Sequence, residues 1–247
     1  MHLFKTRNIL LSLALFLLMP ALMAQDAHDL LAKLDNVMFS PRDKQGRISI
    51  ILIDKAGTEK VREAEMFQKG RYHKLYRYTK PESQAGIATL SLPDGVMWLY
   101  MPAFGSPKKI SLLAKSQAFT GTDFSYEDMA TEPYSERFFP RLAGTADDHY
   151  LLELTPRSDK SQYSKIIIRQ HPEYFYPMHM EYFDKSGKKY KEASYRYEKT
   201  GGYWNAKEVV MTDLKKQHST KILMNDVIFD QGLTDDIFTV ENLKPSE

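Results

Sequence analysis

The sequence predicts a mainly β protein whose single antiparallel sheet is curled, with one helix over its open side. About eleven segments have the apolar or alternating pattern of β-strands, and tight turns separate them. One amphipathic helix precedes these segments, and no linker or internal repeat divides the chain. A single antiparallel sheet of so many strands has to curl or close, because strand twist accumulates. We therefore expect one α+β domain over residues 25–247, with short helical turns as further cover.

The first 24 residues have the pattern of a secretory signal peptide. Lys5 and Arg7 make the start basic, residues 9–19 are apolar, and residues 21–24 provide small side chains for cleavage. The apolar run is shorter than the roughly 20 residues that a membrane-spanning helix needs. We expect cleavage after Ala24 and a mature protein that is soluble in the periplasm. An uncleaved membrane anchor is the alternative.

Composition excludes several classes of protein. The chain has no cysteine, so it has neither a lipid-accepting cysteine nor a disulfide, and its stability depends on its core. The whole chain has 34 basic and 32 acidic residues, and removal of Lys5 and Arg7 leaves 32 of each. This balance argues against a nucleic-acid partner, which requires a basic excess, and against membrane binding by charge alone.

Residues 25–39 are expected to form the helix. Its apolar side chains recur at helical spacing, and Asp29 and Lys33 are placed for an exposed ion pair. The expected strands are residues 48–53, 61–68, 71–79, 85–92, 96–101, 149–154, 164–169, 178–183, 189–197, 204–213 and 221–229. Residues 130–146 lose this periodicity, so they are either a functional loop or a surface excursion.

The sequence contains no recognisable catalytic constellation. There is no thiol nucleophile, no G-x-S-x-G or H-E-x-x-H motif, and no glycine-rich phosphate loop. His149 follows two aspartates, but neighbouring strand residues point to opposite faces, which makes a triad there a weak candidate. His171 and His179 would need further ligands to bind a metal. We expect no enzyme activity, no metal and no cofactor.

The segment 96–128 is the most distinctive part of the chain. An aromatic strand ends at Pro102, a lysine-containing loop follows, and the string FTGTDFSYED comes next. Asp123 is a good N-cap residue for a turn over residues 124–128, so we expect Asp123 to have a structural role.

The strings WLYMP, KKI and FTGTDFSYED, in this order, resemble the LolA-like family of periplasmic carriers that sort outer-membrane lipoproteins. Residues 176–177, 181–184, 211–213 and 235–239 extend the resemblance over most of the chain. It implies a half-open barrel under helices and a carrier for a lipid or for lipoprotein acyl chains. It also implies a membrane partner, either an inner-membrane exporter of the resistance-nodulation type or a lipoprotein-releasing transporter. One departure is that only one long helix is evident here.

Aromatic and methionine side chains are the candidates for a lipid-binding surface. Stripes of such residues usually fill a closed core, whereas the family resemblance favours an open apolar cavity. The residues expected to line the cavity are Tyr76, Trp98, Tyr100, Phe119, Phe124, Met180 and Tyr182. The choice of face on the strand 96–101 depends on register, because a shift by one residue would substitute Met97, Leu99 and Met101.

These observations favour a monomeric carrier in the periplasm that is not an enzyme. The alternative is a non-enzymatic accessory module of an envelope transport complex, and a hydrolase built around His149 or His179 is a weaker third hypothesis. A continuous apolar cavity that opens to solvent would distinguish a carrier from an accessory module.

Overall fold

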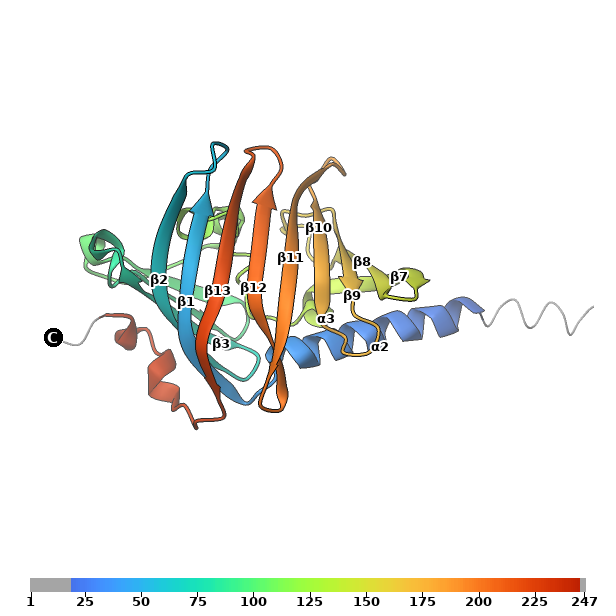
Figure 1. Ribbon diagram of the computed structural model, residues 1–247, viewed down its shortest axis with the longest axis horizontal. Helices are drawn as coiled ribbons and strands as arrows, with labels where there is room; N and C mark the ends of the chain where they lie inside the picture. Colours follow the sequence, from blue (N-terminus) through green and yellow to red (C-terminus); the bar gives the residue numbers. More distant parts are fainter. Residues whose placement is uncertain (1–18, 245–247) are drawn as a thin grey trace, which may run out of the picture.

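The computed structural model describes residues 19–244, and it contains one antiparallel sheet of 13 strands that curls without closing (Figure 1). The sheet consists of two meanders joined through the pair β1–β13, so the first and last strands of the chain lie at its centre. Strands β6 and β7 are the two free edges. The expected fold class is confirmed. Most of the expected signal peptide, residues 1–18, lies outside the described residues.

The first meander comprises β1 (Asp43–Ile53), β2 (Glu59–Lys69), β3 (His73–Lys80), β4 (Ala88–Leu92), β5 (Val96–Tyr100) and β6 (Lys108–Lys109). The second comprises β7 (Phe138–Ala146), β8 (His149–Pro156), β9 (Lys165–Gln170), β10 (Pro177–Phe183), β11 (Lys189–Thr200), β12 (Tyr203–Asp213) and β13 (His218–Phe229).

All eleven expected strands are present, and the sequence pattern missed β6 and β7. Strand β7 lies inside residues 130–146, which were expected to be irregular because Pro140 and Gly144 are typical turn residues. A proline is tolerated on an edge strand, where its missing N–H faces no partner. The pairing of β7 with β8 also shifts between Leu142 and Gly144, which obscures the two-residue alternation.

Helix α2 (Met19–Phe39) lies beside the short helix α3 (Tyr134–Arg137) and over the concave face of the sheet (Figure 1). Ala27, Leu31 and Leu34 are fully buried there, and the expected Asp29–Lys33 pair is present at 2.7 Å. The helix begins six residues before the expected cleavage site. Among residues 19–244, no helix is long and apolar enough to cross a membrane.

A buried carboxylate joins the two helices. Asp35 of α2 has no exposed surface, and its oxygens accept the backbone N–H groups of Tyr134 at 2.8 Å and Ser135 at 2.9 Å. These two donors belong to the first turn of α3, where helical N–H groups lack partners within their own helix. Asp35 therefore caps α3 from another helix and holds the two elements together.

Residues 110–137, called here the crossover segment, connect one edge of the sheet to the other along the concave face. The segment contains η3 (Leu112–Ser116) and η4 (Phe119–Gly121). Phe119, Phe124 and Met129 are buried in the same core as the apolar side of α2 and the inner residues of β8–β12. The crossover segment and α2 therefore cover the concave face together.

Polar contacts attach the crossover segment to the sheet at several strands. The guanidinium of Arg62 on β2 donates to the carbonyl of Thr120 at 2.6 Å, and the Thr120 hydroxyl bonds Tyr78 on β3. Within the segment itself, the Arg137 guanidinium donates to the carbonyl of Glu127 at 3.1 Å. Backbone polar groups inside a curled sheet need such partners because water is excluded.

Asp123 contacts β13 and does not cap the turn that follows it. Its Oδ2 accepts a hydrogen bond from the Thr220 hydroxyl at 2.7 Å and lies 2.7 Å from Nδ1 of His218. The cap is Ser125, whose Oγ accepts the N–H of Asp128, while the Asp128 carboxylate accepts the Ser125 N–H. The capping role expected of Asp123 is wrong, since a neighbouring serine and aspartate cap the turn reciprocally.

The most enclosed ion pair among the described residues joins Asp128 and Lys191 of β11. The Lys191 side chain is 3% exposed and the Asp128 side chain 5% exposed. The hydroxyl of Tyr163 donates to the other oxygen of Asp128, and the rings of Tyr163 and Tyr182 each lie 5.1 Å from the Lys191 ammonium. Both charges are therefore partnered although almost no water reaches them.

The C-terminal residues cover the opposite, convex face. Two short helices, η5 (Asp235–Phe238) and η6 (Glu241–Leu243), pack on β3 and β4. The Asp43 carboxylate of β1 accepts the N–H groups of Gln231 at 2.8 Å and Gly232 at 2.9 Å, which fixes the turn leading to them.

Lys191→Met should lower the free energy of unfolding by about 3–5 kcal/mol, because it leaves the Asp128 carboxylate buried without a counter-charge. Urea denaturation measures the change. Lys188→Met, at an exposed lysine in the preceding hairpin, should change stability by less than about 0.5 kcal/mol. The double variant Asp128→Asn/Lys191→Met should recover part of the loss. Equal losses in the single and double variants would assign the effect to packing.

Asp123→Ala should cost about 1–3 kcal/mol, because the buried Thr220 hydroxyl loses its acceptor. Asp123→Asn retains an acceptor oxygen and should cost less. Thermal unfolding gives the comparison, and lipid affinity measured on the folded fraction should not change. Normal stability with lost affinity would make Asp123 a direct ligand contact.

Candidate functional site

A cavity of about 160 Å³ lies between the C-terminal turn of α2, the crossover segment and the concave face of the sheet. Most of its wall is apolar or aromatic. The apolar and aromatic residues that line it are Val37, Met38, Phe39, Tyr76, Phe124, Met129, Ala130, Tyr134, Tyr182, Tyr195, Tyr197, Trp204, Ala206, Val209, Met211, Ile222 and Met224. Several of these side chains, including Met38, Tyr195 and Trp204, are only half-buried, so solvent reaches the cavity.

A group of tyrosines forms the wall near β10. The hydroxyls of Tyr134, Tyr182 and Tyr195 point at the sulfur of Met180, at 3.6, 3.4 and 3.5 Å. Burial raises the pKa of Tyr134 to about 12 and raises that of Tyr182 and Tyr195 further. The hydroxyls therefore remain neutral at physiological pH, and this wall presents rings and weakly partnered hydroxyls to the cavity.

One end of the cavity is lined by two lysines. Lys44 of β1 and Lys74 of β3 are both paired in register with Gln68 of β2, so the three residues form one row across the sheet. Neighbouring strands are about 4.8 Å apart, which places the Cα atoms of the two lysines about 10 Å apart. In the part of the chain that the structure describes, neither ammonium forms an ion pair.

The surroundings of the two lysines disfavour their charge. Burial lowers the pKa of Lys44 to about 8, and burial together with the charge of Lys44 lowers the pKa of Lys74 to about 7. A lysine that lacks a carboxylate partner in a poorly hydrated site releases its proton more readily than a free lysine does. The cavity therefore combines an apolar body with an electropositive end.

The structure brings three of the expected cavity residues to the wall and places two just behind it. Tyr76, Phe124 and Tyr182 line the cavity. Met180 and Phe119 are on the same side of the sheet, but they are enclosed in the core, Met180 behind its tyrosines. That these residues contact a ligand remains a prediction.

Trp98 and Tyr100 do not line the cavity, which corrects the expectation for strand β5. Both belong to the cluster on the convex face, with Leu90 and Phe238 of the C-terminal cover. Met97 has its side chain in the inner core. Both faces of β5 are apolar because each is covered, one by the crossover segment and the other by the C-terminal helices, so alternation alone did not distinguish them.

Sequence reasoning also missed the two lysines and the cavity-lining Trp204. A signal was present for Lys74, which has the same strand parity as Tyr76 and Tyr78 and therefore shares their face. No such signal identified Lys44. Strand β1 begins at Asp43, five residues before the apolar alternation from which this strand was predicted.

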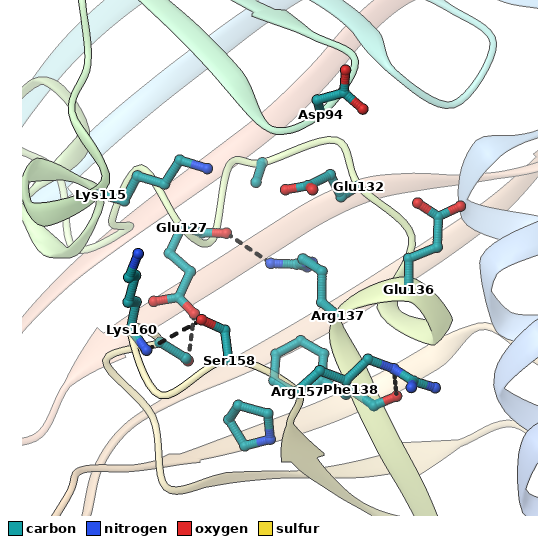
Figure 2. Close-up of a pocket in the computed structure, with 13 residues that line it drawn as sticks. Asp94, Lys115, Glu127, Glu132, Glu136, Arg137, Phe138, Arg157, Ser158 and Lys160 are labelled. Carbon is teal, nitrogen blue, oxygen red and sulfur yellow. Dashed lines mark hydrogen bonds between the residues drawn. The ribbon is translucent and has the colours of Figure 1, made fainter.

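A second cavity, of about 280 Å³, lies between the crossover segment and the ends of β7 and β8 (Figure 2). Its charged lining residues are Asp94, Lys115, Glu127, Glu132, Glu136, Arg137, Arg157 and Lys160. Acidic and basic groups are equal in number, and Glu127 is already bonded to the Ser161 hydroxyl at 2.5 Å and the Gln162 N–H at 3.0 Å. Such a balanced, internally bonded lining favours no charged ligand.

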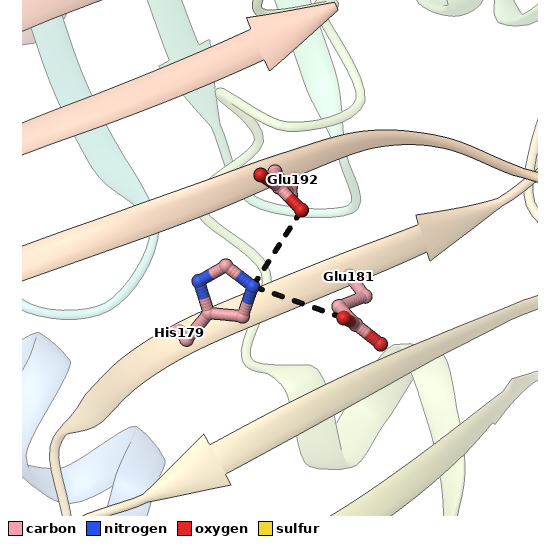
Figure 3. Close-up of side chains that lie close together, drawn as sticks. All are labelled: His179, Glu181 and Glu192. Atoms are coloured by element: carbon pink, nitrogen blue, oxygen red, sulfur yellow. Dashed lines mark ion pairs between the residues drawn. The ribbon is translucent and has the colours of Figure 1, made fainter. Parts of the chain in front are cut away.

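His179, Glu181 and Glu192 converge on the outer side of β10 and β11 (Figure 3), an arrangement that could suit a metal. The ammonium of Lys189 already lies 3.1 Å from Glu181 and 3.0 Å from Glu192. Burial lowers the pKa of His179, so its imidazole is neutral at physiological pH. Lys189 supplies the positive charge that a metal would bring, and we assign this cluster to cross-strand pairing.

The stability of the protein should rise with pH between about 7 and 10. The pKa values of Lys44 and Lys74 are lower in the folded protein than the ordinary 10.5, so the unfolded chain binds more protons in this range. The cost of enclosing two charges is fully present below pH 7 and disappears as the lysines deprotonate. Urea denaturation should show a flatter pH dependence for Lys44→Met/Lys74→Met than for wild type. The exposed variant Lys60→Met should keep the wild-type slope, and parallel curves for all three proteins would contradict this expectation.

Strong matches among the solved structures include the following three. An outer-membrane lipoprotein-sorting domain from Vibrio parahaemolyticus is 24% identical, with a TM-score of 0.83 over 90% of this chain and 100% of the other. A DUF1329 family protein from Desulfovibrio piger is 23% identical, with the same TM-score over 90% and 99%. A LolA superfamily protein from Nitrosomonas europaea is 25% identical, with a TM-score of 0.73 over 86% and 97%.

A search of curated proteins found no match. A family model described as "Uncharacterized protein" matches residues 70–245, which is more than half of the chain and includes the crossover segment and β4–β13. The chain therefore belongs to this family, and its fold is the LolA-like fold of these solved structures.

Proposed function

We propose that residues 25–247 form a periplasmic carrier that binds a lipid, or the acyl chains of a lipoprotein, in the cavity beneath α2. One observation carries the proposal: an apolar cavity that solvent can reach lies inside a curled, unclosed sheet of the LolA-like fold. Each methylene transferred from water to such a surface contributes about 0.8 kcal/mol. A carrier that has to release its cargo benefits from many weak contacts of this kind.

The cavity is small for a whole acyl chain, since ligand pockets usually measure about 300–1,000 Å³. Loading therefore requires its wall to move. The C-terminal turn of α2 is the natural mobile part, because Val37 and Met38 meet the cavity through apolar contacts and are half-buried. Asp35, one turn earlier, is anchored to α3 and would limit the movement.

A binding role also agrees with the chemistry of the lining. Its tyrosine hydroxyls are poor acids because burial raises their pKa, and its one buried carboxylate, Asp128, is engaged by Lys191. We propose delivery to or from an inner-membrane exporter or a lipoprotein-releasing transporter, with the protein acting as a monomer after cleavage at Ala24.

Val209→Trp should weaken binding of a fluorescent fatty acid by about tenfold or more, because the larger side chain occupies the cavity. Val210→Trp is the matched control, since adjacent strand residues point to opposite faces and Val210 faces outward. Fluorescence titration measures the affinities, and circular dichroism checks that each variant is folded. Ala206→Phe provides a second, smaller obstruction if the tryptophan variant does not fold.

Two results would count against the carrier. If wild type binds no fluorescent lipid, the cavity is not a lipid site and the accessory-module hypothesis takes its place. If Val209→Trp and Val210→Trp lose affinity equally, lipid binds elsewhere on the surface.

A further inference from the structure

The electropositive end of the cavity carries an inference about the class of cargo. We propose that Lys44 and Lys74 together bind the anionic headgroup, a carboxylate or a phosphate, of an amphiphile whose hydrocarbon chain lies along the apolar wall. This inference rests on the proposed carrier function and makes it specific: the preferred cargo is an acidic lipid.

The two lysines converge because of their register. Lys44 and Lys74 flank Gln68 in one cross-strand row, on the same face as Met66 and Tyr76 in the next row. An ammonium on a four-carbon stem reaches about 6 Å from its Cα, so two lysines two strands apart can contact one anion between them. Between the two lysines, the side-chain amide of Gln68 donates to the carbonyl of Gly70 at 3.3 Å and forms the bottom of this end of the cavity.

No carboxylate of the cavity wall neutralises these lysines. Asp128 is bonded to Lys191 and Tyr163 on the other side of the cavity. The carboxylate of Glu132 points into the second cavity (Figure 2), where it lies against the turn at Gly95. The turn of α2 that closes this end supplies only apolar side chains.

Charge and solvation then favour an anion. Two ammonium groups that are partly removed from water and repel each other raise the free energy of the empty site. An anionic headgroup between them restores charge-assisted hydrogen bonds and relieves that repulsion. The apolar wall that continues from this end, with Tyr76 and Trp204, explains why a bare anion is a poorer fit than an amphiphile.

The competing explanation is that both side chains extend their ammonium groups to bulk water, as lysines often do. The affinity would then not depend on the headgroup. The two explanations differ in one measurable quantity, which is the ratio of affinities for an acidic and a neutral amphiphile with the same hydrocarbon chain.

Laurate below its critical micelle concentration and lauryl alcohol below its solubility limit provide this pair. Trp204 lines the cavity and Trp98 does not, so Trp98→Phe leaves one tryptophan that reports binding by its fluorescence. We expect laurate to bind more tightly than lauryl alcohol. Lys44→Met and Lys74→Met, each in this background, should weaken laurate binding by about tenfold and change lauryl alcohol binding by less than about twofold. Lys60→Met removes an exposed lysine and should change neither affinity.

The dependence on pH gives a second readout. Raising the pH from about 6.5 to about 9 should weaken laurate binding, because the lysines lose their protons, and should leave lauryl alcohol binding unchanged. The tyrosines that face this end, Tyr76 and Tyr197, stay neutral throughout because burial raises their pKa. The charged groups elsewhere in the wall are Asp128, Glu132 and Arg137, and none of them contacts either lysine. In the lysine variants the pH dependence should diminish.

The outcomes separate this inference from the function on which it rests. Equal affinities for laurate and lauryl alcohol, insensitive to both lysines, would overturn the headgroup site and leave the carrier intact. Failure of both probes to bind would overturn the carrier itself, and the headgroup site with it. Acetate or inorganic phosphate that displaces laurate at comparable concentrations would identify a site for free anions and overturn the assignment to a lipid.

Discussion

The fold requires that the polar backbone of the crossover segment cross the concave face of a curled sheet. The crossover segment has to pass from edge to edge over the concave face, where water cannot satisfy its N–H and C=O groups. The Asp128–Lys191 pair, enclosed by Tyr163 and Tyr182, is the central contact of this passage. Each charge alone would be costly there, so the pair holds the segment to β11 only as a unit.

The cavity follows from the same arrangement. The crossover segment and α2 fill the concave face over β8–β10, where Leu152, Ile168 and Met180 have no exposed surface. At the starts of β1 and β3 the cover is thinner: α2 ends at Phe39, and Lys44 and Lys74 are only half-buried. What remains is a partly filled space between firmly packed elements, and this is where the wall can yield to a ligand while the core remains intact.

The sequence predicted the class of fold and eleven of the strands because their alternation and turn residues are local signals. It located the distinctive crossover segment but assigned its cap to Asp123 instead of Ser125, since both residue types cap turns and only tertiary contacts with His218 and Thr220 distinguish them. The faces of β5 were interchanged because both are covered. Whether Lys74 faces a cavity or solvent depends on how the sheet curls and on where α2 ends, which no local pattern encodes.

An apolar cavity with a charged end differs from a purely apolar one in how it releases cargo. Hydrocarbon contacts do not depend on pH, whereas the contribution of Lys44 and Lys74 depends on their protonation, on salt and on competing anions. The Lys74 ammonium lies 6.0 Å from the centre of the Tyr76 ring, and neither lysine has a carboxylate partner among the described residues. An anionic cargo that neutralises both lysines would therefore stabilise the protein as it binds. By linkage, an acceptor surface that offers its own negative charges to the lysines would lower their affinity for an acidic headgroup. An acceptor that opens the end of α2 to water would have the same effect, and neither change would disturb the core. If an acidic headgroup binds at these lysines, the part of the affinity that depends on pH lies beside the last turn of α2, where Lys44 and Lys74 are half-exposed.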